Sequence, residues 1–128
     1  MLHDPFLMTD MDKAVQRITS AISNKESIRV YGDYDVDGTT SVSLMYSFLK
    51  SQNAVCDYYI PDRYNEGYGI SYLGIDDAIS KGISLMITLD CGVKAIEKIA
   101  YAQSKGLDII VCDHHRPGEI LPNAFAVL

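Results

Sequence analysis

The sequence is poor in cysteine: it contains three, and none of them belongs to a CxxC pair. Cys56, Cys91 and Cys112 are an odd number of thiols, whereas a disulfide framework or a zinc ribbon needs an even set at regular spacing. The sequence therefore argues against both kinds of scaffold. We expect the three thiols to be buried and reduced, and we expect the protein to work in the cytoplasm.

Long apolar runs and a positive charge balance are also missing. No apolar run reaches the length of a membrane-spanning helix, and the first residues lack the basic-then-apolar order of a signal peptide. The net charge is −6, which argues against a broad basic surface that binds nucleic acid by charge alone. The surplus of carboxylates leaves room for bound cations. The sequence thus indicates no membrane partner and a site built around cations.

Hydrophobic residues recur with a period that alternates between helix-like and strand-like. Strands are predicted at 27–32, 55–60, 84–90, 107–113 and 124–128. Helices are predicted from a capping box at Thr9 through Ile22, over about 39–52, from a cap at Ser71 to Lys81-Gly82, and from Val93 to Lys105-Gly106.

This alternation predicts the fold class. Strands separated by helices of this length form a three-layer α/β/α domain with a Rossmann-like, mostly parallel sheet of about five strands and right-handed crossovers. With 128 residues, 48% of them hydrophobic, the chain can build one domain with a real core. It contains no internal repeat and no linker, so we expect a single domain over residues 1–128.

Polar residues follow the predicted strands where a parallel sheet binds its ligands, beyond the carboxyl ends. A single acidic residue at such a place is commonly a helix cap. Here, however, polar or charged residues follow the ends of four predicted strands. The residues are Asp33, Asp35 and Asp37 in "GDYDVDGTT" (32–40), Arg63 and Tyr68 in the loop after the second strand, Asp90, and Asp113, His114 and His115.

These residue types favour a metal site. Carboxylates with one or two imidazoles suit manganese, magnesium or iron. Two ions about 3.5–4 Å apart need a bridging carboxylate, and such a pair activates a water as nucleophile and neutralises charge on a phosphoryl oxygen. The sequence therefore indicates a two-metal site for phosphoryl chemistry.

Two other site types share the opening string. A calcium-binding EF-hand loop that begins at Asp33 needs a glutamate at its twelfth position, which is Leu44 here, and the preceding element is a strand. That interpretation fails. A haloacid-dehalogenase-type phosphatase matches "DVDGTT" (35–40), with Asp35 as nucleophile and Asp37 as general acid. This alternative stays open, although it leaves Asp33 and both histidines without a role.

Three motifs in order, "GDYDVDG" (32–38), "LDCG" (89–92) and "VCDHH" (111–115), resemble those of the DHH phosphoesterase superfamily. Within it, "LHDPFLMTDMDKAVQRI" (2–18) and "PDRYNEGYGIS" (61–71) are similar to the RecJ-like exonucleases. The resemblance covers essentially the whole chain. It implies metal-dependent hydrolysis of phosphodiester bonds in single-stranded DNA, from the 5′ end towards the 3′ end, in DNA repair and recombination.

The resemblance also implies a set of metal ligands for two Mn²⁺ or Mg²⁺ ions. Asp33 and Asp35 would bind the first ion, and Asp37 the second. Asp90 would bridge the two ions, and His114 would complete the shell of the second.

The resemblance further implies catalytic and substrate-binding residues. His115 would face the scissile phosphate and act in catalysis together with Asp37 and Asp90. Arg63, Gly67 and Tyr68 would line the substrate side.

By the same resemblance, residues 1–128 correspond to the N-terminal portion of a DHH catalytic domain. A later metal motif, a DHH-associated domain and an oligonucleotide-binding fold would lie elsewhere, and we expect this portion to be inactive alone. The full-length enzyme would bind the 5′ end of single-stranded DNA, with a single-strand-binding protein and a helicase as protein partners. A phosphodiesterase of the same superfamily that cleaves oligoribonucleotides or cyclic dinucleotides is the alternative.

Overall fold

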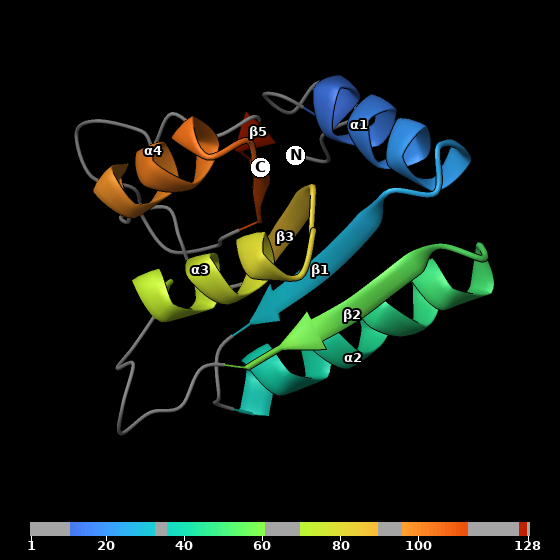
Figure 1. Ribbon diagram of the computed structural model, residues 1–128. Coiled ribbons are helices and arrows are strands. Elements are labelled where there is room, and N and C mark those ends of the chain that lie inside the picture. Colours follow the sequence, from blue (N-terminus) through green and yellow to red (C-terminus); the bar gives the residue numbers. More distant parts are fainter. Residues whose placement is uncertain (1–10, 33–35, 61–69, 90–95, 113–125, 128) are drawn as a thin grey trace, which may run out of the picture.

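The computed structural model describes residues 11–32, 36–60, 70–89, 96–112 and 126–127. Helices and strands alternate along this part of the chain, as Figure 1 shows. The elements are α1 (Met11–Ser23), β1 (Ser27–Gly32), α2 (Val36–Ser51), β2 (Val55–Tyr59), α3 (Tyr72–Ser80), β3 (Leu85–Leu89), α4 (Ile96–Ser104), β4 (Asp108–Cys112) and β5 (Ala126–Val127).

The strands form one five-stranded sheet in the order β2-β1-β3-β4-β5, and every pairing in it is parallel. Figure 1 shows β1 and β2 running side by side in the same direction. The predicted α/β class with a parallel sheet of about five strands is confirmed. In this order the chain leaves β1 towards one edge for β2 and then returns past β1 to β3, so the winding direction changes between β1 and β3.

Side chains of the strands alternate between two apolar clusters, one on each face of the sheet. Val30 packs with residues of α1 and α2, such as Ala21 and Leu49. The next residue, Tyr31, points to the other face and packs with residues of α3 and α4, such as Ile75 and Ile99. The sheet is therefore buried between two helical layers, which confirms the three-layer prediction.

The predicted ends of α3 and α4 are confirmed. Ser71 is the N-cap of α3, and its side chain accepts a hydrogen bond from the backbone N–H of Gly74 at 3.0 Å. Gly82 and Gly106, which follow the two helices, have φ angles of +75° and +86°. Glycine adopts these left-handed conformations without the steric cost of a Cβ, so a Lys-Gly pair is an effective helix end.

The beginning of α2 differs from the prediction. The helix starts at Val36 rather than near residue 39, so Asp37 is its second residue. Apolar periodicity marks this helix only from Val42 onwards, and Gly38 is typical of a turn. A carboxylate in the first turn is nevertheless stabilised by the positive end of the helix dipole.

The thiols are partly as predicted. Cys56 and Cys112 form no disulfide, but each is only partly buried, and Cys91 lies outside the described residues. Burial raises the pKa of the Cys56 thiol, which keeps it protonated near neutral pH. Within the ranges that the structure describes, no helix is both long and apolar enough to cross a membrane.

Candidate metal and substrate site

The last residues of three neighbouring strands lie side by side at the carboxyl edge of the sheet. Gly32 of β1 pairs with Leu89 of β3, and Leu89 pairs with Cys112 of β4. Neighbouring strands are about 4.8 Å apart, so this row is narrow. In the sequence, the row continues directly with Asp33, Asp90 and Asp113.

The topology marks the same edge independently of the motifs. In doubly wound sheets, ligands bind beyond the carboxyl ends of the strands at the point where the winding direction changes. Here that point lies between β1 and β3, which end at Gly32 and Leu89. The strand ends that precede Asp33 and Asp90 in the sequence are therefore those at the switch point.

Most predicted site residues lie outside the described residues. These are Asp33, Asp35, Arg63, Gly67, Tyr68, Asp90, His114 and His115. Asp37 is placed by its backbone in the first turn of α2, while the position of its side chain is not described. The structure thus places the elements that carry the predicted ligands. Within the described ranges, no group of three or more histidine, cysteine or acidic side chains could hold a metal ion.

A hydrogen bond joins the end of β1 to the beginning of α3. The backbone N–H of Ser71 donates to the hydroxyl of Tyr31 at 3.1 Å. The ring of Tyr31 is fully buried and stacks on the ring of Tyr59, with 5.4 Å between centroids and 13° between planes. In the sequence, Ser71 follows the segment that contains Arg63 and Tyr68.

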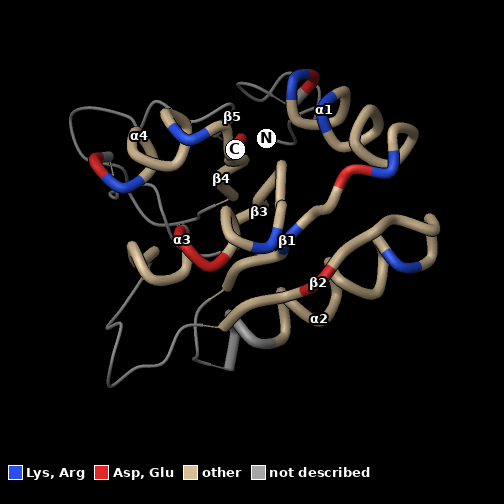
Figure 2. The backbone as a smooth tube through the Cα atoms, viewed as in Figure 1, with Lys and Arg blue, Asp and Glu red and all other residues tan. Residues whose placement is uncertain are grey.

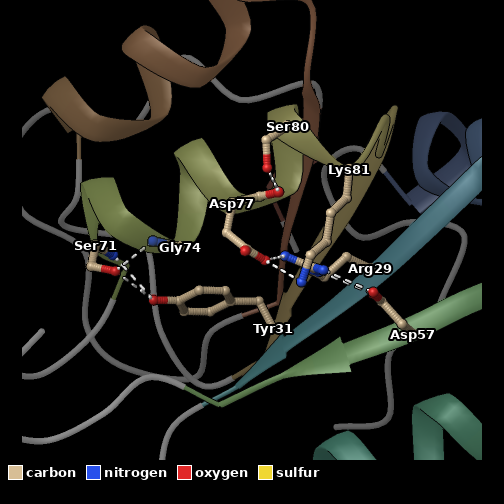
Figure 3. A network of polar contacts seen from close by, with 8 residues as sticks. All are labelled: Arg29, Tyr31, Asp57, Ser71, Gly74, Asp77, Ser80 and Lys81. Atoms are coloured by element: carbon tan, nitrogen blue, oxygen red, sulfur yellow. Dashed lines mark hydrogen bonds and ion pairs between the residues drawn. The ribbon is translucent and has the colours of Figure 1, made fainter.

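Arg29 forms a second polar connection on the same face, which Figure 3 shows together with the first. Its side chain is only 2% exposed. The guanidinium donates to both carboxylate oxygens of Asp57 at 2.9 and 2.8 Å and to Asp77 at 2.6 Å. The hydrogen bond from Arg29 lowers the pKa of the Asp77 carboxyl, with a smaller contribution in the same direction from Lys81. The positive charge of the guanidinium is therefore compensated by two carboxylates within the fold.

Sequence analysis did not identify Arg29. The signal was present, because a charged residue stands in the middle of the otherwise apolar strand 27–32. A buried arginine needs partners, but Asp57 and Asp77 lie 28 and 48 positions away in the sequence. No local pattern connects the three residues.

At the amino ends of the strands, charged side chains also form ion pairs with one another. Arg17 of α1 donates to Glu26 at 2.9 Å and to Asp108 at 2.9 Å. The hydroxyl of Ser84 donates to the same Glu26 carboxylate at 2.7 Å. The hydrogen bond from Arg17, followed by that from Ser84, lowers the pKa of Glu26. These charges hold α1 on the beginnings of β1, β3 and β4.

A pocket of about 180 Å³ lies near the beginnings of β1 and β2 and the end of α3. Residues lining it include Ser27, Val55, Cys56, Lys81 and Ile83. These positions are at the amino ends of the strands, so the pocket is separate from the predicted metal edge.

Basic residues are spread over the described part of the molecule. Figure 2 shows lysine and arginine on α1, at the end of α2 and on α4 rather than in one stripe. This distribution agrees with the net charge of −6. A strong electrostatic grip on a nucleic acid backbone needs clustered basic side chains, and the described part does not supply one.

The fold is a doubly wound α/β domain, and in the sequence aspartates follow the strand ends at the switch between β1 and β3, where domains of this class bind their ligands. Comparison with protein families assigns the domain more closely. Residues 27–128 match the model described as "DHH family, N-terminal domain". The chain belongs to the DHH family.

Individual relatives extend the match to almost the whole chain. RecJ of Bacillus subtilis, a single-stranded-DNA-specific exonuclease, is 45% identical over 126 residues, which are 98% of this chain and 16% of that protein. RecJ of Escherichia coli is 37% identical over 124 residues, 94% of this chain and 21% of that protein. The predicted resemblance to the DHH superfamily and its RecJ-like branch is confirmed.

A solved structure agrees with these sequence matches. The crystal structure of an exonuclease RecJ bound to manganese superposes with a TM-score of 0.82 and 31% identity, covering 90% of this chain and 30% of that chain. The present chain spans about a fifth of the length of its RecJ relatives, between 16% and 22%.

Proposed function

We propose that this chain carries most of the metal ligands of a nuclease that hydrolyses phosphodiester bonds in single-stranded DNA from the 5′ end. The observation that carries the proposal is the row of strand ends Gly32, Leu89 and Cys112. Each of the three is followed in the sequence by an aspartate that belongs to a DHH motif. Relatives named as single-stranded-DNA-specific exonucleases support the substrate.

The proposed ligand set fits two manganese or magnesium ions. Asp33 and Asp35 would hold the first ion, Asp37 and His114 would hold the second, and Asp90 would contribute to both. Aspartate oxygens with one imidazole are a donor set that suits these metals. The strands that precede these residues, β1, β3 and β4, are consecutive in the sheet, so their carboxyl ends lie along one short row. A relative that was crystallised with manganese supports the choice of metal.

When bound, the two ions would supply an activated water and would offset charge on the phosphoryl oxygens. The chain's own residues then position the substrate. His115 faces the scissile phosphate and donates a hydrogen bond to it. Arg63 can pair with a neighbouring phosphate through two parallel hydrogen bonds. Gly67 allows the backbone to approach the nucleotide closely, and the ring of Tyr68 can stack on a base.

The role in DNA repair and recombination, a cytoplasmic location, and a single-strand-binding protein and a helicase as partners belong to the same proposal. The thiols of Cys56 and Cys112 form no disulfide, which is compatible with a reducing compartment. The described part of the chain has no clustered basic surface, so most of the electrostatic grip on DNA would come from residues outside that part.

A nuclease assay on the full-length gene product that contains this sequence tests the proposal. The substrates are 5′-phosphorylated single strands, duplexes and dinucleotides, with manganese and with a chelator. We expect manganese-dependent release of nucleotides from the 5′ end of single strands. Preference for dinucleotides would favour the small-nucleotide phosphodiesterase instead. A covalent phosphate trapped on Asp35 would contradict a metal-activated water and favour the dehalogenase-type mechanism.

A further inference from the structure

Two residues of one strand hold α3 at both of its ends. Arg29 and Tyr31 are two positions apart on β1, so their side chains point to the same face of the sheet. Tyr31 accepts a hydrogen bond from the N-cap residue Ser71 at 3.1 Å. Arg29 donates to Asp77, near the other end of the helix, at 2.6 Å. Figure 3 shows both contacts and the strand that they share.

An aromatic ring from β2 lies against both side chains. Tyr59 stacks on Tyr31 with 5.4 Å between ring centroids, and the guanidinium carbon of Arg29 lies 5.3 Å from the Tyr59 centroid. Stacked rings and a cation over a ring are favourable contacts that also restrict movement of each partner. The Tyr31 ring is therefore fixed from the side of the sheet.

The first turn of α3 is shaped to receive this ring. A Cβ at Gly74 would lie 2.7 Å from Cε2 of Tyr31 and 3.2 Å from Oγ of Ser71. The first distance is shorter than any normal contact between carbon atoms. Only glycine lets the Tyr31 ring come this close to the helix, and the Tyr31 hydroxyl then reaches the backbone N–H of the cap.

We propose that Tyr31 is a positioning residue that fixes the beginning of α3 against the end of β1 and thereby sets the affinity for single-stranded DNA. This inference rests on the proposed function. In the sequence, Tyr31 is two residues before the proposed metal ligand Asp33, which directly follows β1. Ser71 comes directly after the segment that contains the substrate residues Arg63 and Tyr68. The hydrogen bond from the Ser71 N–H to the Tyr31 hydroxyl thus connects the end of β1, which precedes the proposed metal ligands, with the N-cap of α3, which follows the proposed substrate residues.

The two sides do not depend equally on this bond. Backbone hydrogen bonds to β2 and β3 hold β1 on both edges. The backbone N–H of Ser71 is held to the sheet by the Tyr31 hydroxyl. Loss of the hydroxyl therefore displaces the substrate side and leaves the metal side in place. If the hydroxyl only satisfied a buried backbone N–H, its loss would lower the free energy of unfolding. The affinities for single-stranded DNA and for manganese would then stay unchanged.

The variant Tyr31→Phe in the full-length gene product tests this role, because it keeps the ring and removes the hydroxyl. We expect the KM for single-stranded DNA to rise about fivefold to tenfold, as loss of one positioning hydrogen bond allows. The kcat stays within about twofold, and the manganese concentration for half-maximal activity does not change.

Tyr101→Phe is the matched control. The Tyr101 hydroxyl donates to Asp76 of α3 at 2.6 Å, so the same atom is removed from a contact with the same helix away from its N-cap. We expect wild-type KM and kcat for this variant. Gly74→Ala is a second test, because it displaces the Tyr31 ring without removing its hydroxyl, and it raises KM in the same direction. Circular dichroism confirms that each variant is folded.

The outcomes separate this inference from the proposed function. An active wild-type enzyme whose KM is unchanged by both Tyr31→Phe and Gly74→Ala overturns the positioning role and leaves the nuclease intact. An increase in the manganese requirement instead of KM overturns it as well, because the metal side would then depend on the bond. A wild-type protein without nuclease activity overturns the proposed function, and the positioning role falls with it.

Discussion

Arg17 and Asp108 are in contact although 91 positions separate them in the sequence: Arg17 Nε donates to Asp108 Oδ2 at 2.9 Å. The same guanidinium holds Glu26 with two further hydrogen bonds, at 2.9 and 3.2 Å. Through these contacts the first helix of the described chain is fixed to the beginnings of β1 and β4. This part of the molecule consequently responds to pH through its carboxylates.

Acid should weaken the contribution of Glu26 to stability. Its pKa is lower in the folded protein than the ordinary glutamate value of 4.5, because Arg17 and Ser84 donate to it. Such a group stabilises the fold above its unfolded pKa and loses that effect as the pH falls through its folded pKa. We expect Glu26→Gln to lower the free energy of unfolding by about 1–2 kcal/mol near neutral pH. In urea titrations, this difference should shrink below about pH 4.5.

Glu97→Gln is the control for this experiment, since Glu97 is an exposed glutamate in the first turn of α4. We expect a change below about 0.5 kcal/mol at neutral pH. A penalty for Glu26→Gln that stays constant down to about pH 3 would contradict the proposed linkage.

Replacement of the buried arginine should be costly. Arg29→Met removes three charge-assisted hydrogen bonds to Asp57 and Asp77. Both carboxylates are partly exposed and can be rehydrated, so we expect a loss of about 2–3 kcal/mol in the free energy of unfolding rather than the larger cost of a fully buried orphan charge. Chemical denaturation measures it.

Lys81→Met provides the matched comparison, because Lys81 contacts the same Asp77 at 3.3 Å but is 60% exposed. Exposed ion pairs contribute little, so a loss below about 0.5 kcal/mol is expected. Equal losses of unfolding free energy in the two variants would show that the buried contacts of Arg29 contribute no more to stability than the exposed ion pair of Lys81.

Gly74→Ala should destabilise the protein even though alanine is the better helix former. Alanine in a helix interior is favoured over glycine by about 1 kcal/mol. At this position, however, the new methyl group would lie 2.7 Å from the Tyr31 ring. We expect a net loss of about 1–3 kcal/mol, as for other overpacked sites. The neighbouring exposed residue offers a control: Leu73→Ala should change stability by less than about 0.5 kcal/mol. A stabilised Gly74→Ala variant would refute the close approach.

Manganese binding should depend on the aspartate that follows β3. If Asp90 bridges the two ions, Asp90→Asn weakens manganese affinity at least about tenfold, because one donor to each ion becomes neutral. Isothermal titration of the full-length gene product measures the affinity. Asp12→Asn, which neutralises an exposed aspartate of α1, should leave it unchanged. A manganese affinity equal to that of the wild type in Asp90→Asn would show that Asp90 is not a metal ligand.

Residue type marked the helix ends that carry a glycine, whereas the ends of α1 and α2 were predicted, to within one residue, from apolar periodicity alone. Gly82 and Gly106 end α3 and α4 as predicted, with positive φ angles. After α1 and α2, the positive φ angles belong to Lys25 and Asn53, at 58° and 61°. Asparagine tolerates this conformation, but lysine adopts it only where the surrounding structure offsets the cost. Residue type alone does not mark the end of α1.

Contacts between distant elements were the part that the sequence did not reveal. The order of strands and helices followed from local periodicity, and the strand ends that precede the aspartates followed from that order. The partners of Arg29 depend on the register of β1 against β2, where Arg29 stands opposite Asp57. The contact of Tyr31 with Ser71 depends on how α3 packs on the sheet. Such contacts arise from tertiary packing, which periodicity does not encode.

The order of the sheet also affects how the chain folds while it is being synthesised. β1 is complete once residue 32 has been added, and its first neighbour β2 follows by residue 59. Its other neighbour, β3, is complete only at residue 89. Until then, one edge of β1 has no partner strand, and an unpaired strand edge invites association with other chains. A ribosome-bound chain that has just completed β2 should therefore need protection by a chaperone, and it should lose that need once β3 has emerged.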